Sequence, residues 1–172
     1  MLSRAVMKVI LISPHHINSK RKAGFHWIAN AFAKKGWETI FVTAPIRYTA
    51  WFLGDHRTRY FSLKDIKKVK ETPNSNIKSY IFMTLLNPIS SNKKLLVYFS
   101  IILSKIYGKL LPNNLKNIIY AADIIIFESS EALFLFDAIH QINGKAKYIY
   151  RVSDNLETIG ASRYVINYEQ KI

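Results

Sequence analysis

Short apolar runs alternate along the chain with segments of helical periodicity. The first run, Ala5 to Ser13, is nearly continuous in apolar residues and rich in β-branched ones, which is typical of a strand buried on both faces of a parallel sheet. Residues 24–35 then place apolar side chains at helical spacing, and Gly36 supplies a common helix stop. Glu38 to Ala44 predicts a second strand, ended by Pro45, so the beginning of the chain forms one β-α-β unit.

The rest of the chain repeats this alternation less regularly. Residues 46–76 show no sustained period, which predicts a long connection with at most one short helix. The elements predicted beyond it are strands at 77–84, 124–128 and 147–152 and helices at 90–111, 115–121 and 130–143. Repeated β-α-β units with buried strands predict an α/β fold, a Rossmann-like open parallel sheet with helices on both faces. Because no repeat or flexible linker divides the chain, we expect residues 1–172 to form a single domain.

The charge of the chain is strongly positive and unevenly distributed. There are 25 Lys and Arg residues against 11 Asp and Glu residues, a formal net charge of +14. Residues 1–122 hold 20 basic and 4 acidic side chains (+16), whereas residues 123–172 hold 5 and 7 (−2). The first two thirds of the chain should therefore attract phosphates, nucleic acid or an anionic membrane.

The absence of cysteine and of two glycine-rich motifs excludes several classes of chemistry. Without cysteine the chain has no disulfide framework, no Cys-ligated zinc, no iron–sulfur cluster and no Cys nucleophile. The patterns GxGxxG and GxxxxGK[ST] are absent, which disfavours NAD binding and P-loop chemistry. The apolar start of the chain is too short for a signal peptide, and polar residues interrupt the stretch from Leu95 to Leu111. No transmembrane segment is predicted.

In open parallel sheets ligands bind beyond the carboxyl ends of the strands, so the loops after strands are the places to search for a site. In the first loop, Lys20, Arg21 and Lys22 lead into the predicted helix, and no acidic residue precedes Glu38. Cations are unfavourable at a helix N-terminus unless an anion binds there. This loop, with Ser19, is a candidate site for phosphate or carboxylate, and a solvated basic turn is the equal alternative.

Three histidines lie in or beside this loop. His15, His16 and His26 have no carboxylate or Cys near them in the sequence, and the neighbouring cations would repel a divalent metal. We therefore expect no metal site and no cofactor, and interpret His15 and His16 as a surface pair. His26 stays among the candidate acceptor- or anion-binding residues.

The second loop follows the strand 124–128. Ser130 lacks the GxSxG pattern of a nucleophile and is explained as an N-cap, with Glu131 in the favourable first turn of a helix. Glu128 is different, because a carboxylate at the end of an apolar strand is costly to bury without a partner. Glu128 is expected to hydrogen-bond ligand hydroxyls or to pair with a basic residue.

The third loop follows the strand 147–152. Asp154 lies just past this strand, with Arg151 close by, and partial burial in a cleft would suit it to act as a general base. The structural alternative is that Ser153 or Asp154 caps a helix that begins at Asn155.

Taken in order, the three loops resemble a known family. The segments SPHHINSKRKAGFHWIANAFAKKGWETIFVT, FESSEALFLF and YRVSDNLETIG are similar to the amino-terminal half of GumK-like glucuronosyltransferases of xanthan biosynthesis, which have the two-domain GT-B fold. The resemblance covers the beginning and the end of the chain but not residues 45–122.

The resemblance implies an inverting, metal-independent sugar transfer from a nucleotide sugar to a lipid-diphosphate-linked oligosaccharide at the inner face of the bacterial cytoplasmic membrane. It implies that this chain is the acceptor-binding half, with the nucleotide-sugar domain outside it. It further implies Asp154 as catalytic base. Ser19, Lys20, Arg21, Lys22, His26, Glu128 and Arg151 are the candidate acceptor- or anion-binding residues.

Two other classes of function remain open at this stage. Strong positive charge with 13% aromatic residues also suits a basic nucleic-acid-binding domain without catalysis. No helix-turn-helix, RRM or KH pattern supports this alternative, and most aromatic residues lie in apolar runs that indicate core. A response-regulator-like module would need acidic residues after the first strand, where His15 and His16 stand instead.

Overall fold

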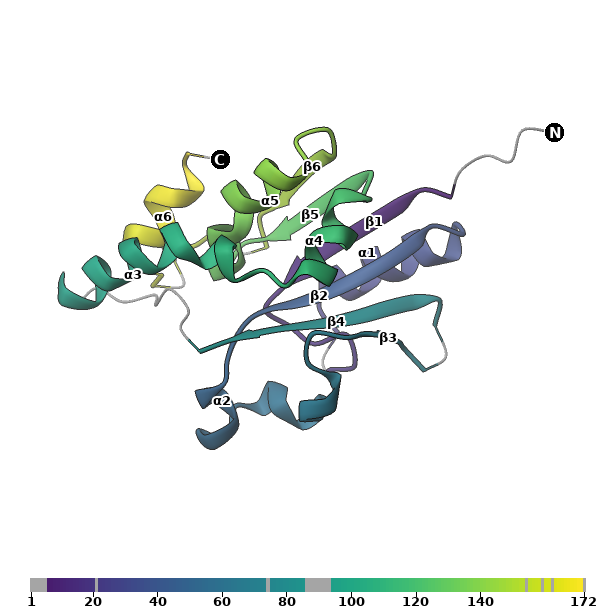
Figure 1. The fold of residues 1–172 in the computed structure, drawn as a ribbon, viewed down its shortest axis with the longest axis horizontal. Coiled ribbons are helices and arrows are strands. Elements are labelled where there is room, and N and C mark those ends of the chain that lie inside the picture. Colours follow the sequence, from purple (N-terminus) through teal and green to yellow (C-terminus); the bar gives the residue numbers. More distant parts are fainter. Residues whose placement is uncertain are drawn as a thin grey trace.

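A computed structural model of the chain describes residues 6–20, 22–73, 75–85, 94–153, 155–158, 160–161 and 163–171, without the side chain of residue 94. Its centre is a six-stranded sheet with the order β3-β4-β2-β1-β5-β6, drawn in Figure 1. The strands are β1 (Lys8–Ser13), β2 (Glu38–Arg47), β3 (Val69–Glu71), β4 (Ile77–Thr84), β5 (Ile124–Glu128) and β6 (Lys147–Arg151). Five strands are parallel to one another, which confirms the predicted α/β, Rossmann-like sheet.

The helices lie on both faces of this sheet (Figure 1). They are α1 (Gly24–Lys34), α2 (Thr49–Phe52), α3 (Lys94–Tyr107), α4 (Asn113–Tyr120), α5 (Phe136–Ile142) and α6 (Arg163–Glu169). Short 3₁₀ turns complete them: η1 (His56–Tyr60), η2 (Leu63–Asp65), η3 (Gly108–Leu110) and η4 (Glu131–Leu135). The carboxyl ends of the parallel strands point to the side where α2, α3 and α6 lie, at the left of Figure 1.

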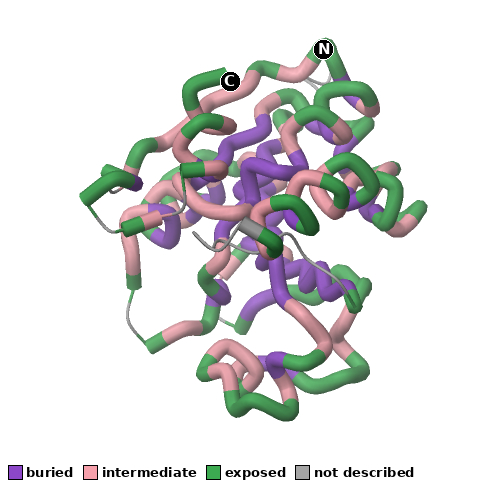
Figure 2. Tube along the Cα trace, turned by 90° about the vertical axis from the view of Figure 1, so that its left-hand side faces the viewer, coloured by how far each residue is buried: buried purple, intermediate pink, exposed green. Residues whose placement is uncertain are grey.

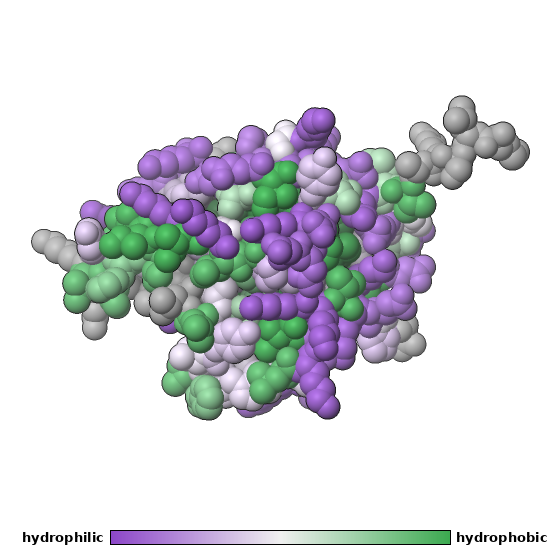
Figure 3. All heavy atoms as spheres, viewed as in Figure 1, coloured by the Kyte–Doolittle hydropathy of each residue, from purple (hydrophilic) through white to green (hydrophobic). Residues whose placement is uncertain are grey.

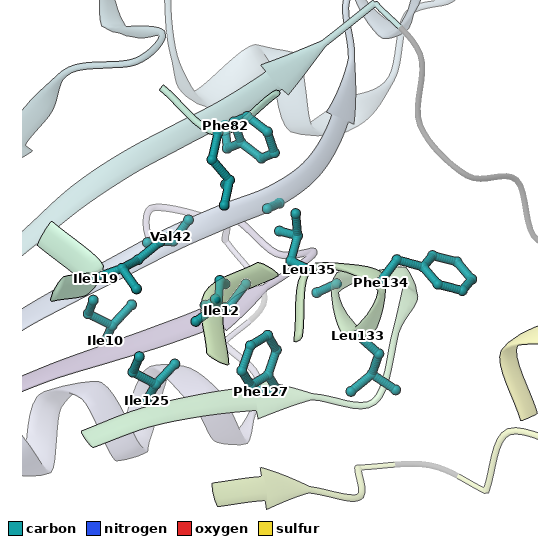
Figure 4. Packing of buried hydrophobic residues seen from close by; sticks show 14 of the residues in the cluster. Ile10, Ile12, Val42, Phe82, Ile119, Ile125, Phe127, Leu133, Phe134 and Leu135 are labelled. Carbon is teal, nitrogen blue, oxygen red and sulfur yellow. The ribbon is translucent and has the colours of Figure 1, made fainter. Parts of the chain in front are cut away.

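Alternate residues of the central strands pack into two hydrophobic cores, one on each face of the sheet. Ile10, Ile12 and Val42 face a core with residues of α4, α5 and η4, of which Leu133 and Leu135 are labelled in Figure 4. Their neighbours Leu11 and Phe41 face the opposite core, against α1. Because these strands are buried on both faces, successive residues are apolar and their sequences are nearly continuous apolar runs. Figure 2 shows the resulting buried interior enclosed by exposed loops.

The region 46–76 differs from its prediction, because it adds a strand to the sheet. Its residues form α2, η1, η2 and the edge strand β3, which pairs antiparallel with β4. All three residues of β3 are exposed. The sheet is therefore mixed and not wholly parallel. A short exposed strand has no apolar alternation, so its sequence carries no strand signal.

The prediction that Pro45 ends the second strand is wrong. β2 continues to Arg47, with a cis peptide bond between Ala44 and Pro45. The pairing of β2 with β4 shifts between Thr43 and Ile46, so Pro45 lies in an irregularity of the ladder. Proline is tolerated at such a point because no ladder hydrogen bond needs its missing N–H.

Two predicted helices also begin differently. The segment from Ser130 opens with the 3₁₀ turn η4 before α5 starts at Phe136. No helix starts at Asn155, whose side chain accepts hydrogen bonds from the backbone N–H groups of Glu157 and Thr158, and α6 begins only at Arg163. An asparagine that bonds the backbone ahead of it favours a turn, which competes with helix formation.

Helix α3 has an exposed apolar stripe. Its side chains Leu95, Tyr98, Phe99, Ile102 and Ile106 are between 40% and 69% exposed. Hydrophobic side chains gather over this helix at the left of Figure 3. Within the described ranges, no single helix has the length and apolar composition of a membrane span; 95–110 and 113–120 have them only jointly, across an 80° bend.

Candidate functional site

Polar residues form a row across the carboxyl edge of the sheet, on the face that α1 covers. In the strand register Ser13 lies opposite Thr43, and Glu128 lies opposite Arg151. Ile12 and Phe127 are the last residues that pair between β1 and β5, and Ser13 and Glu128 each follow one position later. The row therefore runs across β2, β1, β5 and β6 at one level, where ligands bind in sheets of this kind.

Glu128 joins this row together. Its side chain is only 4% exposed, and it accepts a short hydrogen bond from the Ser13 hydroxyl. Its other oxygen lies 3.3 Å from the Arg151 guanidinium. These two partners offset the cost of burying a carboxylate. Of the two roles expected for Glu128, the structure thus provides the pairing with a basic residue.

Arg151 connects the row to the N-terminus of α1. Its guanidinium carbon lies 5.8 Å from the ring centroid of Phe25, within the range of a cation–π contact. A Cβ atom at Gly24 would collide with the guanidinium of Arg151, so only glycine permits this approach. The first turn of α1 contains no acidic residue, which leaves Arg151 and the positive helix end side by side.

The interpretation of His15 and His16 as a surface pair is wrong for His16. Its side chain is buried and stacks on the rings of Tyr60 and Phe61, with centroid distances of 5.7 Å for both. The contacting aromatic residues lie more than 40 positions along the chain, so the local sequence gives no sign of this burial. His15 is exposed.

His16 and His26 organise the loop between β1 and α1. The backbone N–H of Asn18 donates to Nδ1 of His16, at 3.0 Å, and the N–H of Ala23 donates to Nδ1 of His26, at 3.0 Å. Nε2 of His26 lies 2.9 Å from the carbonyl oxygen of His16 and 3.2 Å from the Ser19 hydroxyl. Burial lowers the pKa of His26, and burial with the nearby charge of Lys22 lowers the pKa of His16 to about 4. Both rings are therefore neutral near pH 7.

We expect acidification to destabilise the domain through His16. The neutral ring accepts the Asn18 N–H, and the unfolded chain binds protons below the ordinary pKa of 6.5, so stability is lost as the pH falls below that value toward about 4. At pH 5 the loss from this one group is about 2 kcal/mol. Urea unfolding at pH 7.5 and pH 5 measures it, with His16→Gln expected to reduce the pH dependence.

The matched control for this experiment is His56→Gln, because the His56 side chain is 74% exposed. It should leave the pH dependence as it is in the unsubstituted chain. An equal loss of stability at pH 5 in the His16→Gln variant would contradict the assignment.

The basic residues of this loop are differently placed. Lys20 and Lys22 are both exposed, but the Lys22 ammonium also donates to the carbonyl oxygen of Ile17, at 2.6 Å. Burial lowers the pKa of Lys22. Arg21 and Asp154 lie outside the described residues. Across the residues that are described, no group of three His, Asp or Glu side chains is arranged to hold a metal ion.

The second loop agrees with its prediction. The Ser130 hydroxyl accepts the backbone N–H of Ala132, at 3.2 Å, as expected of an N-cap. Glu131 occupies the first turn, although that turn is 3₁₀.

The fold and the polar row define a Rossmann-like α/β domain with a candidate ligand site at the carboxyl edge of its sheet. Its sequence matches the family model described as "Glucuronosyltransferase GumK, N-terminal domain" over residues 11–172, and the chain belongs to this family. It is also 26% identical over 158 residues to a "UDP-glucuronate:glycolipid 2-beta-glucuronosyltransferase" of Xanthomonas campestris pv. campestris. That alignment covers 91% of this chain and 38% of the relative.

The match confirms the resemblance found in the sequence and extends it through residues 45–122. It favours a glycosyltransferase domain over the nucleic-acid-binding alternative. The structure agrees on one point, since the fully buried side chains include Phe25, Phe41, Phe82 and Phe127, which are core residues and not stacking platforms.

Proposed function

We propose that residues 1–172 form the acceptor-binding domain of an inverting glycosyltransferase. The enzyme transfers a glucuronosyl or related residue from a nucleotide sugar to a lipid-diphosphate-linked oligosaccharide in exopolysaccharide synthesis. The observation that carries the proposal is the family match over residues 11–172, which includes all three loops with candidate residues. The activity for which the Xanthomonas relative is named, from UDP-glucuronate to a glycolipid, supports the classes of donor and acceptor.

In this proposal Asp154 is the catalytic base, and the chemistry needs no metal or cofactor. A positioned carboxylate within hydrogen-bond reach of the acceptor hydroxyl accepts its proton as the hydroxyl attacks the sugar. The nucleotide sugar binds through a second domain outside this chain. The chain aligns with only 38% of the relative's length. The experiment is transfer of labelled sugar from UDP-glucuronate to a glycolipid by an enzyme with both domains, measured with and without Asp154→Asn.

The anionic part of the acceptor is assigned to the start of α1. Arg151 is held there by Glu128, the absence of a side chain at Gly24 leaves room for its guanidinium, and Lys20 and Lys22 lie in the loop before α1. Together with Arg21 they supply positive charge for a diphosphate. Ser19 and His26 support this loop by their mutual contact.

We also propose that the domain binds an anionic membrane surface peripherally, on the cytoplasmic side. The exposed apolar stripe of α3 supplies side chains to enter the interface, and the exposed Lys105 and Lys109 lie on the same helix and just after it. Each basic residue near an anionic leaflet contributes about 1 kcal/mol. An amphipathic helix with these features lies in the plane of the interface.

Replacing Leu95, Phe99 and Ile102 by serine is expected to weaken binding to anionic vesicles by about tenfold or more, because their apolar area no longer leaves water. All three are at least 41% exposed, so the fold should persist. Co-sedimentation with vesicles of increasing anionic-lipid content measures the effect. Trp27→Ser is the control, since Trp27 is 66% exposed on α1, away from α3. Equal binding to neutral vesicles would count against the proposal.

A further inference from the structure

A pocket lies at the carboxyl edge of the sheet, beyond the row of Ser13, Glu128 and Arg151. It has a volume of about 200 Å³ and lies where β2 extends past Pro45. Its described walls include Arg47 from β2, Ala50 and Leu53 from α2 and the turn after it, and Glu131 from η4. We name it the Arg47–Glu131 pocket.

One wall of this pocket is fixed by a network of hydrogen bonds. The Arg57 guanidinium makes three contacts with the Asp55 carboxylate, at 2.6 to 3.1 Å. Its remaining nitrogen donates to the carbonyl oxygens of Pro45, at 3.2 Å, and Pro14, at 3.4 Å. Arg57 therefore ties the loop after β1 to the bulge of β2, and the pair has no net charge to offer a ligand.

Arg47 and Glu131 differ from this pair. Both are half-buried and line the same pocket, yet among the described residues neither forms an ion pair or a side-chain hydrogen bond. They line one pocket without pairing with each other, so the Arg47 guanidinium offers hydrogen-bond donors to a ligand there and the Glu131 carboxylate offers acceptors.

The two arginines and two carboxylates that line this pocket give it no net charge, which favours an uncharged ligand. A phosphate or a carboxylate would meet Arg47 but would be repelled by Glu131. A pyranose ring suits both, because its hydroxyl groups accept from a guanidinium and donate to a carboxylate. Its C–H face can rest on Pro45 and Ala50, which also line the pocket. At about 200 Å³ the pocket is smaller than sites for drug-sized ligands and holds one ring.

We infer that the Arg47–Glu131 pocket binds one uncharged pyranose unit of a saccharide, with Arg47 and Glu131 selecting its hydroxyl pattern. The inference rests on the proposed function, in which a glycan binds at this edge of the sheet. It deepens that function by separating two subsites. The start of α1 takes the anionic part of the acceptor, and this pocket takes a neutral sugar.

The test uses the ¹⁵N-labelled chain titrated with the methyl α-pyranosides of glucose, mannose and galactose, with glucuronate and inorganic phosphate as charged probes. At least one neutral pyranoside should cause saturable shifts of the Thr49, Ala50 and Leu53 amide signals, with little dependence on salt. Arg47→Gln and Glu131→Gln should each weaken that binding by about tenfold, since each removes a charged hydrogen-bond partner. Lys64→Gln, an exposed charge in the same part of the chain, should leave it unchanged.

No shift of these amides with any neutral pyranoside would overturn the inference, as would tighter binding of glucuronate or phosphate at the same signals. Glu131→Gln is nearly isosteric, and the amide spectra of both variants report whether the fold is intact. In the two-domain enzyme Arg47→Gln should raise KM for the glycolipid with kcat within about twofold. Sugar binding without any transfer would reject the proposed function alone, and transfer without sugar binding in this pocket would reject this inference alone.

Discussion

Asp154→Asn is expected to lower sugar transfer by about 100-fold or more in an enzyme that joins this domain to a donor-binding domain. Asparagine keeps the size of aspartate and an oxygen that can accept hydrogen bonds. It cannot take a proton from the attacking hydroxyl. The fold should therefore be unaffected, and the loss should lie in kcat. The rate of transfer from UDP-glucuronate to the glycolipid, with the thermal midpoint of each variant, separates these effects.

Glu157→Gln is the matched control, because Glu157 is an exposed carboxylate three residues further along the chain. It should transfer sugar at the normal rate. A near-normal rate in Asp154→Asn would reject Asp154 as the base. Glu128 is then the next carboxylate to examine, although the Ser13 hydroxyl and Arg151 already occupy its two oxygens. To act as a base it would have to leave one of these partners.

Glu128→Ala is expected to destabilise the domain by about 2 to 3 kcal/mol. Removing one member of a fully buried ion pair costs about 3 to 5 kcal/mol, and the Arg151 side chain is 32% exposed, so water offsets part of this loss. The substitution also leaves the Ser13 hydroxyl without its acceptor. Urea unfolding of the chain at neutral pH measures the change.

Two companion variants make this measurement specific. Glu157→Ala, at an exposed position, should change stability by no more than about 0.5 kcal/mol. The double variant with Glu128→Leu and Arg151→Met should be more stable than the single variant Glu128→Leu, because the unpaired charge of Arg151 is then gone from the edge of the sheet. A loss below about 1 kcal/mol in Glu128→Ala would mean that the pair contributes little to the fold.

The strands buried on both faces were predictable from the chain alone. Residues 77–84 and 124–128 form β4 and β5 with the predicted bounds, because short, mostly apolar runs with β-branched and aromatic residues favour buried strands. Local signals also identified the Ser130 cap and the Gly36 stop, which has the positive φ of 78° that glycine adopts without strain. The repeated β-α-β pattern also indicated that a ligand site lies in the loops after these strands.

By itself, the sequence determined the five parallel strands, the helices that pack on them and the loops to examine, since these follow from periodicity and from residues close together in the chain. The tertiary structure alone decided which side chains meet. Ser13 and Glu128 are 115 positions apart, yet their hydrogen bond joins the first and fifth strands. The burial of His16 by Tyr60 and the pocket between Arg47 and Glu131 likewise depend on distant segments. Such contacts arise from packing between elements that are far apart in the chain, so local residue patterns do not predict them.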